Sequence, residues 1–199
     1  MPNPKKLILA SGSQRRSEIL NSLKLDFSIS PSSIDERFHK DEAPADYIIR
    51  IARAKVVDVA KNLETGLVLG ADTIVVFEGR IIGKPLNEEN AKEILKVLAG
   101  RWHAVMTGVA LYDIDSKKEV VDFEKTLVRF APLSQDEIDW YISTGEYKGK
   151  AGGYAIQGYA AAFVEEIAGN YLNVVGLPVP LVYRLGKRLG FSLIDEIVT

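Results

Sequence analysis

The chain has 199 residues, of which 47% are hydrophobic and 26% charged, as expected of one large globular domain or of two small lobes that share a core. Its formal net charge of −2 argues against a general nucleic-acid or membrane-surface protein, because those usually carry a basic excess or stripe. The absence of cysteine excludes disulfides, thiolate catalysis and zinc–cysteine sites. No apolar run has the length of a secretory signal or a membrane span, so we expect a cytoplasmic protein without nucleic-acid or membrane partners.

A short strand, a small-residue turn and a helix start are predicted at the beginning of the chain. Leu7 to Ala10 is an apolar run, Ser11-Gly12-Ser13 turns the chain, and a helical pattern begins at Gln14. The first N–H groups of a helix have no backbone partner, and the helix dipole places partial positive charge there. The stretch therefore predicts an anion-binding site at the helix N-terminus.

Two arginines, Arg15 and Arg16, lie in the first turn of this helix. A cation there opposes the helix dipole, which indicates a compensating anion. Arg16 precedes the apolar positions Ile19 and Leu20, so the helical period places it on the inward face. The alternative is an arginine that reaches solvent past the helix end or pairs with a structural carboxylate.

A second helix is expected from Pro44 to about Asn62, after a strand over Phe27 to Ser30. Most of its charged residues fall on the outer face of the helix. Lys55 instead lies beside Ala52 and Val59, toward the buried side. This position is unusual for a lysine that serves only solubility.

The polar loop from Pro31 to Ala43 joins these two elements and carries Asp35 and Glu36. Their carboxylates could hold a divalent cation through oxygen ligands. A solvated run of charges explains the segment equally well.

One carboxylate, Asp72, interrupts the apolar run from Leu67 to Val76, which predicts a central strand covered on both faces. Burial of a carboxylate is costly unless it is hydrogen-bonded, ion-paired or metal-bound. Asp72 is therefore either a structural aspartate that accepts from backbone N–H groups, or a general base or metal ligand beside the arginines. The break in the strand after Gly70 favours the functional interpretation.

A hairpin is predicted after this strand, with its tip at Glu78-Gly79-Arg80. It returns to Gly83-Lys84-Pro85, a rigid setting that directs the lysine side chain. An ordinary surface lysine is the alternative for Lys84.

The second half of the chain mixes helices and strands. Expected in order are a helix from Asn87 to Gly100, strands over Trp102–Asp113 and Glu119–Ala131, a helix with a capping box of Ser134 and Glu137, a loop over Glu146–Gly153, a strand near Ala161–Ile167 and a helix from Pro178 to about Leu189. Some strands are joined by hairpins and others by helices, which predicts an α/β domain around a long mixed sheet.

Two further polar features remain. Gln157, between Ile156 and Gly158, has two donors and one acceptor and could recognise the edge of a base, but a hydrogen-bonded strand residue is an equal alternative. His39 and His103 are the only histidines, and their surroundings favour solvated or structural roles.

The polar residues are more informative as a set than singly. Arg15, Arg16, Lys55 and Lys84 are cations in unusual local settings, and Asp35, Glu36 and Asp72 are carboxylates that could hold a metal. The sequence has neither a P-loop nor a GxGxxG, GxSxG or HExxH motif. Several cations together with a metal-competent acidic group are suited to binding a triphosphate.

Four ordered motifs resemble those of the Maf family of nucleoside triphosphate pyrophosphatases, which is related in fold to inosine triphosphate pyrophosphatases. They are LASGSQRR (Leu9 to Arg16), GADT (Gly70 to Thr73), GKP (Gly83 to Pro85) and KAGGYAIQG (Lys150 to Gly158). The resemblance extends over essentially the whole chain, as far as VVGLP (Val174 to Pro178).

The resemblance implies one Maf-like domain over residues 1–199, with two lobes around an extended mixed sheet and a nucleotide in the cleft between them. It implies hydrolysis between the α and β phosphates, with magnesium or manganese as the divalent cation. It assigns Asp72 as catalytic base, with Glu36 and Asp72 near the metal. The phosphate-binding residues that it implies are Ser11, Arg16, Lys55 and Lys84.

Three residues match the family branch that acts on dTTP and UTP: Arg15, Thr73 and Gln157. The resemblance therefore implies a pyrimidine triphosphate as substrate, and it suggests a homodimer. The family is also associated with inhibition of septum formation. The alternative function is accordingly a nucleotide-binding regulator of cell division in which hydrolysis is secondary.

Overall fold

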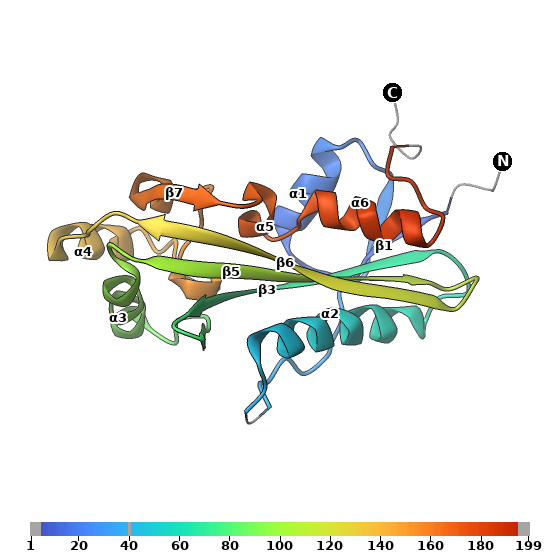
Figure 1. Cartoon of the computed structure of the whole chain (residues 1–199), viewed down its shortest axis with the longest axis horizontal. Helices are drawn as coiled ribbons and strands as arrows, with labels where there is room; N and C mark the ends of the chain where they lie inside the picture. Colours follow the sequence, from blue (N-terminus) through green and yellow to red (C-terminus); the bar gives the residue numbers. More distant parts are fainter. Residues whose placement is uncertain (1–4, 40, 195–199) are drawn as a thin grey trace. The chain divides into compact units, whose positions relative to one another are not determined.

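The computed structural model describes residues 5–39 and 41–194 and has a mixed α/β fold, which confirms the predicted fold class (Figure 1). Its strands are β1 (Leu7–Leu9), β2 (Phe27–Ile29), β3 (Leu67–Phe77), β4 (Arg80–Ile82), β5 (Trp102–Asp113), β6 (Lys118–Phe130) and β7 (Val164–Ala168). Its α-helices are α1 (Gln14–Ser22), α2 (Pro44–Ala60), α3 (Glu88–Leu98), α4 (Gln135–Ser143), α5 (Tyr171–Val175) and α6 (Val179–Arg188). Two 3₁₀ helices, η1 (Ala151–Gly153) and η2 (Tyr159–Phe163), precede β7.

The strands form one seven-stranded sheet in the order β2-β1-β3-β5-β6-β7, and β4 pairs with β3. The chain divides into two compact units. The first contains Met1–Asp72, Thr107–Glu124 and Gly176–Thr199, and the second contains Thr73–Met106 and Lys125–Val175. The cleft that the family resemblance implies stays a prediction.

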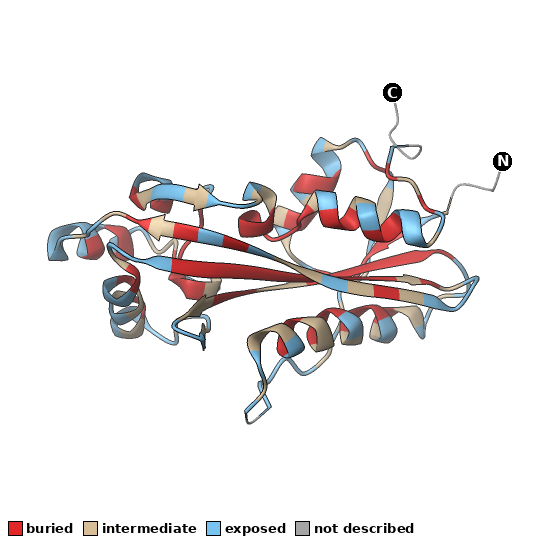
Figure 2. Ribbon diagram, viewed as in Figure 1, coloured by how far each residue is buried: buried red, intermediate tan, exposed pale blue. Residues whose placement is uncertain are grey.

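The first unit is built on parallel pairing of β1 with both β2 and β3. Parallel strands are normally covered on both faces, and this explains why β1 and the first half of β3 are buried apolar runs (Figure 2). The helix α2 packs on this sheet through Ala52, Val56 and Val59, in one cluster with Ile8 and Val68. The sequence pattern predicted both strands and the helix.

A glycine lets α2 approach β3 closely. A Cβ atom at Gly70 would lie 2.7 Å from Val56 Cγ1 and 2.8 Å from the Ala52 carbonyl oxygen, so any larger residue would push the helix away. The same Cβ atom would lie 3.3 Å from Lys55 Cβ, so this close contact also places Lys55 beside the following residues of β3.

The second unit contains the predicted hairpin and helix caps. The β3–β4 turn has positive φ at both Glu78 (48°) and Gly79 (77°), as a two-residue hairpin turn requires. Asn87 caps α3 by accepting from the Asn90 N–H, and Ser134 and Glu137 form the predicted capping box of α4.

The end of this unit differs from the sequence-based expectation in two respects. The strand expected near Ala161–Ile167 begins only at Val164, because the residues before it form η2. The Glu146 carboxylate accepts from the N–H groups of Tyr159 and Ala160, and this favours a helical turn over a strand there. The short helix α5 was not predicted; its N–H at Asn173 is capped by the Asn170 side chain.

His103 lies in an aromatic cluster of the second unit, as its structural interpretation predicted. It is 2% exposed, its Nε2 lies 2.7 Å from the Tyr154 hydroxyl, and its ring meets that of Phe130 edge to face. Burial lowers the pKa of His103 to about 4, so the imidazole is neutral near pH 7. His39 is exposed.

We expect His103 to make the stability depend on pH. The ordinary pKa of histidine is near 6.5, so between pH 6.5 and 4 the unfolded chain binds a proton that the folded chain does not. The free energy of unfolding should therefore fall by about 3 kcal/mol as the pH is lowered through this window. Urea unfolding at pH 7 and pH 4.5 measures this change. The difference should shrink in His103→Gln, and an equal difference in both proteins would contradict the assignment.

Within residues 5–39 and 41–194, no helix is both long enough and apolar enough to span a membrane.

Candidate functional site

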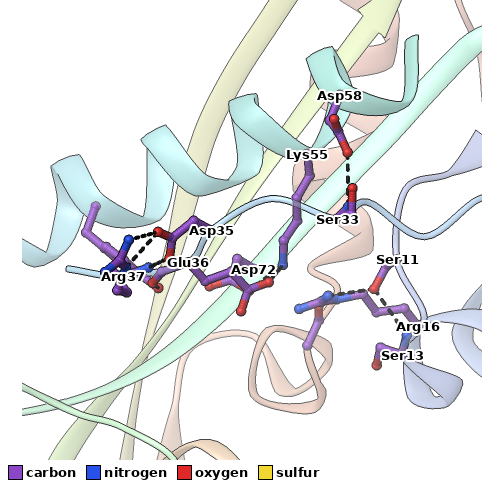
Figure 3. Close-up of polar contacts among 12 residues, drawn as sticks. Ser11, Ser13, Arg16, Ser33, Asp35, Glu36, Arg37, Lys55, Asp58 and Asp72 are labelled. Carbon is purple, nitrogen blue, oxygen red and sulfur yellow. Dashed lines mark hydrogen bonds and ion pairs between the residues drawn. The ribbon is translucent and has the colours of Figure 1, made fainter. Parts of the chain in front are cut away.

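Lys55 joins two carboxylates in the first unit (Figure 3). Its Nζ lies 2.7 Å from Asp72 Oδ1 and 2.7 Å from Glu36 Oε1. The lysine side chain is 7% exposed, whereas those of Asp72 and Glu36 are 14% and 41% exposed. A buried ammonium group needs such partners, because its removal from water is otherwise costly. One cation and two anions leave a net negative charge that is open to solvent mainly on the side of Glu36.

Three separate elements supply this group. Lys55 comes from α2, Asp72 from β3, and Glu36 from the loop before α2. The close packing at Gly70 positions the first two. The loop that carries Glu36 is held by α2, because Tyr47 donates its hydroxyl to the Glu36 carbonyl oxygen at 2.9 Å.

The same loop is fixed a second time by Arg50, also on α2. Its guanidinium contacts both oxygens of Glu42 at 2.6 Å and the carbonyl oxygen of Arg37 at 3.1 Å. The hydrogen bonds from Arg50 lower the pKa of Glu42 to about 2. Burial and the charges of Asp72 and Glu36 raise the pKa of Tyr47, which therefore stays protonated as a donor.

Tyr47 and Arg50 escaped prediction from the sequence. In the sequence pattern, Tyr47 is one more apolar position of α2, and Arg50 is indistinguishable from a solvated charge on its outer face. Their partners lie in an irregular loop, so no periodic signal identifies them.

Arg16 is buried beside the turn that precedes α1. It is 7% exposed, and it donates from Nε to the Gly176 carbonyl oxygen at 2.8 Å and from a terminal nitrogen to Ser11 Oγ at 2.9 Å. The alternative in which this arginine reaches solvent past the helix end is wrong. The hydroxyl of Ser11 also accepts from the Ser13 N–H at 3.2 Å, so Arg16 and the first turn share one hydroxyl.

Arg16 interacts electrostatically with the carboxylates of Asp72 and Glu36. Burial lowers the pKa of Arg16, the charge of Asp72 raises it, Arg15 lowers it and Glu36 raises it. Arginine stays protonated in proteins, so the site holds a fixed positive charge. The Ser13 side chain makes no capping hydrogen bond, and the first turn of α1 has no acidic residue. A helix N-terminus of this kind, beside a buried arginine, is suited to a phosphate group.

A divalent cation fits the residues of this site only together with a ligand. Among the described residues there is no group of three or more His, Cys, Asp and Glu side chains that could hold a metal ion. Glu36 and Asp72 supply two carboxylates on one lysine. Magnesium is commonly bound by one or two carboxylates while substrate phosphates and water complete its coordination. The pair therefore suits a cation that arrives with a phosphate ligand.

Asp35 is turned away from that pair. Its carboxylate lies 2.6 Å from an Arg37 terminal nitrogen, and the hydrogen bond from that side chain lowers the pKa of Asp35 (Figure 3). Its part in a metal site, one of the alternatives from the sequence, has no support from this geometry.

The second unit carries the other predicted residues, Thr73, Lys84 and Gln157. Lys84 is exposed, and the loop around it is held by a hydrogen bond from the Gly152 N–H to the Gly83 carbonyl oxygen at 3.1 Å. Gly152 has φ 66°, and a Cβ atom there would lie 2.7 Å from Val75 Cγ2. The glycines of this loop therefore allow a close backbone approach, which a side chain would prevent.

Gln157 lies in a turn between η1 and η2, not in a strand. Tyr154, Ala155 and Ile156 are buried, whereas Gln157 is exposed. The three preceding side chains thus fix the backbone, and the amide is left available to a ligand.

The chain matches the model of a family described as Maf-like protein over residues 6–189. It is 46% identical to a dTTP/UTP pyrophosphatase of Pyrococcus furiosus, over 95% of this chain and 97% of that protein. It is 47% identical to a dTTP/UTP pyrophosphatase of Halalkalibacterium halodurans, over 94% of this chain and 98% of that protein. The chain is distantly similar to the solved structure of the Staphylococcus aureus Ham1 protein. The two share 14% sequence identity and superpose with a TM-score of 0.45, over 97% of this chain and 94% of that one.

Proposed function

The chain belongs to the Maf family, as its motifs indicate, and we propose that it hydrolyses the bond between the α and β phosphates of dTTP and UTP. Relatives at 43–47% identity over most of the chain carry the name dTTP/UTP pyrophosphatase. The observation that carries the proposal is the group of Lys55, Asp72 and Glu36 in the same unit as the buried Arg16. It combines a base, a fixed cation and two oxygen ligands, which phosphoanhydride hydrolysis needs.

Asp72 is the proposed general base. A water molecule attacks the α phosphorus as Asp72 accepts its proton; the new oxygen–phosphorus bond forms while the bond to the bridging oxygen breaks. The products are a nucleoside monophosphate and pyrophosphate. Lys55 donates to Asp72 Oδ1 and so orients the carboxylate. The buried setting keeps this geometry fixed before the substrate binds.

Phosphate binding is proposed for Ser11, Arg16, Lys55 and Lys84. Arg16 and Ser11 already share a hydrogen bond at the start of α1, where the helix N–H groups add to the positive field. Arginine and lysine stabilise the charge that develops on phosphate oxygens. Glu36 and Asp72 would hold magnesium or manganese, and the cation when bound neutralises negative charge on the phosphates.

Base selectivity is proposed for Arg15, Thr73 and Gln157. The exposed amide of Gln157 offers two donors and an acceptor to a pyrimidine edge. A site that hydrogen-bonds its substrate rejects an analogue without the matching groups, because its polar atoms are then unpaired.

Replacing Gln157 by alanine should therefore lower kcat/KM for dTTP and UTP by roughly tenfold, while inhibition by pyrophosphate changes little. Steady-state rates with four triphosphates and a pyrophosphate inhibition series measure both effects. Equal losses for all bases would assign Gln157 to the scaffold.

The proposed function is tested by assaying pyrophosphate release from a panel of nucleoside triphosphates with magnesium. We expect release from dTTP and UTP, with slower release from purine triphosphates. No release from either pyrimidine triphosphate would contradict the proposal. Orthophosphate in place of pyrophosphate would indicate a different class of phosphatase.

Assignment of residues 1–199 to one Maf-like domain is also a proposal, supported by the family match over residues 6–189. A homodimer rests on the resemblance to the family alone and stays a prediction, as does the cytoplasmic location.

A further inference from the structure

Gln157 lies in a tight turn that extends from Ala155 to Gly158. Within it the Gly158 N–H donates to the Ala155 carbonyl oxygen at 3.0 Å, and on either side lie the short helices η1 and η2. An exposed amide distinguishes bases only when the backbone that carries it is held still, since a mobile amide adapts to any edge. The groups that fix this turn therefore bear on base selectivity.

A tyrosine and a glutamate outside the turn hold its two ends. The Tyr141 hydroxyl, on α4, lies 3.2 Å from the Gly153 carbonyl oxygen, just before the turn, and 3.0 Å from Glu146 Oε1. The carboxylate of Glu146 then accepts from the N–H groups of Tyr159 at 2.8 Å and Ala160 at 3.2 Å, just after the turn. Two side chains thus connect residue 153 with residues 159 and 160.

The side chains of Tyr141 and Glu146 are closely packed, and their surroundings hold them in these hydrogen bonds. A Cβ atom at Gly158 would lie 1.9 Å from Glu146 Oε2, so a larger residue there would displace the carboxylate from this position. Tyr141 is fully buried, and its ring packs against Phe163 with centroids 5.5 Å apart. Burial raises the pKa of Tyr141, and the charge of Glu146 raises it further, so the hydroxyl stays a donor.

We propose that Tyr141 and Glu146 are positioning residues that hold the turn of Gln157 in its base-reading conformation and thereby determine base selectivity. The inference rests on the proposed function, because it assigns the two residues a part in the recognition of its substrate. A helix-capping role alone would give η2 the same hydrogen bonds. The two roles differ in what a substitution changes: selectivity in the first case and only stability in the second.

The test compares Tyr141→Phe and Glu146→Gln with wild type by kcat/KM for UTP and for ATP. Tyr141→Phe keeps the ring and removes only the hydroxyl. Glu146→Gln keeps one accepting oxygen and places an amide donor against a backbone N–H. We expect each to lower the ratio of the UTP to the ATP value by roughly fivefold, about the effect of one hydrogen bond. Inhibition by pyrophosphate should be unchanged.

A matched control is Thr126→Val, in the same unit. It removes a buried hydroxyl that donates to the Asn170 carbonyl oxygen at 3.0 Å, and so it lowers stability without touching the turn. Its UTP to ATP ratio should equal that of wild type. In a Gln157→Ala background, Tyr141→Phe should have no further effect on the ratio, because the amide that it positions is gone.

Unchanged ratios in Tyr141→Phe would overturn the inference, even if Glu146→Gln failed to fold. A further loss of selectivity in the Gln157→Ala background would also overturn it. A wild-type chain that releases no pyrophosphate contradicts the proposed function and with it this inference. An active wild type with unaltered selectivity in both variants contradicts this inference alone.

Discussion

Replacing Asp72 by asparagine should lower kcat for pyrophosphate release from dTTP by a factor of about 10² to 10⁴, the usual contribution of a general base. Asparagine has nearly the same shape but no basic oxygen, so binding of the triphosphate should change much less than turnover. The Lys55 ammonium 2.7 Å from Oδ1 would still find an amide oxygen there. Steady-state kinetics with a pyrophosphate-coupled assay give kcat and KM separately.

Asp58→Asn is the matched control. Asp58 belongs to the same unit and is also hydrogen-bonded, but its carboxylate accepts from the Ser33 N–H at 3.0 Å and not from Lys55 (Figure 3). This variant should retain the wild-type kcat. A value of kcat for Asp72→Asn within tenfold of wild type would contradict the role of Asp72 as base. It would assign the proton transfer to another group.

Lys55→Met should have the second largest effect, because the lysine serves two carboxylates at once. Its removal leaves Asp72 and Glu36 without the cation between them. We expect kcat/KM for dTTP to fall about 10²-fold or more, since both the orientation of the base and a phosphate-binding charge are lost. The free energy of unfolding should fall by about 2 kcal/mol, less than for a fully buried pair because Glu36 is 41% exposed.

A double variant separates the two consequences of this change. Lys55→Met with Glu36→Gln removes one of the repelling charges and should recover most of the lost stability in urea unfolding. Activity should stay low, because the phosphate-binding cation is still absent. Recovery of activity along with stability would assign Lys55 to the scaffold alone.

The strands, helices and turns near the site were predicted from local patterns. The apolar run of β3, the start of α1 at Gln14 and the capping box at Ser134 depend on neighbours in sequence, and the structure confirms them. The inward position of Arg16 followed from the helical period alone. Signals of this kind need no knowledge of the rest of the chain.

Contacts between distant parts of the chain escaped prediction. Arg16 donates to the carbonyl oxygen of Gly176, 160 residues later, and no pattern in the sequence connects the two. The residues before Val164 do not form the expected strand, because Glu146 accepts hydrogen bonds from the N–H groups of Tyr159 and Ala160. The importance of Gly70 lies in its distance from Val56, which sequence periodicity does not contain.

The most direct test of the proposed reaction is the fate of the attacking oxygen. Hydrolysis of dTTP in water enriched in ¹⁸O, followed by mass spectrometry of both products, identifies the phosphorus atom that water attacks. We predict one labelled oxygen in the thymidine monophosphate and none in the pyrophosphate. Label in the pyrophosphate, or formation of thymidine diphosphate, would contradict attack at the α phosphorus.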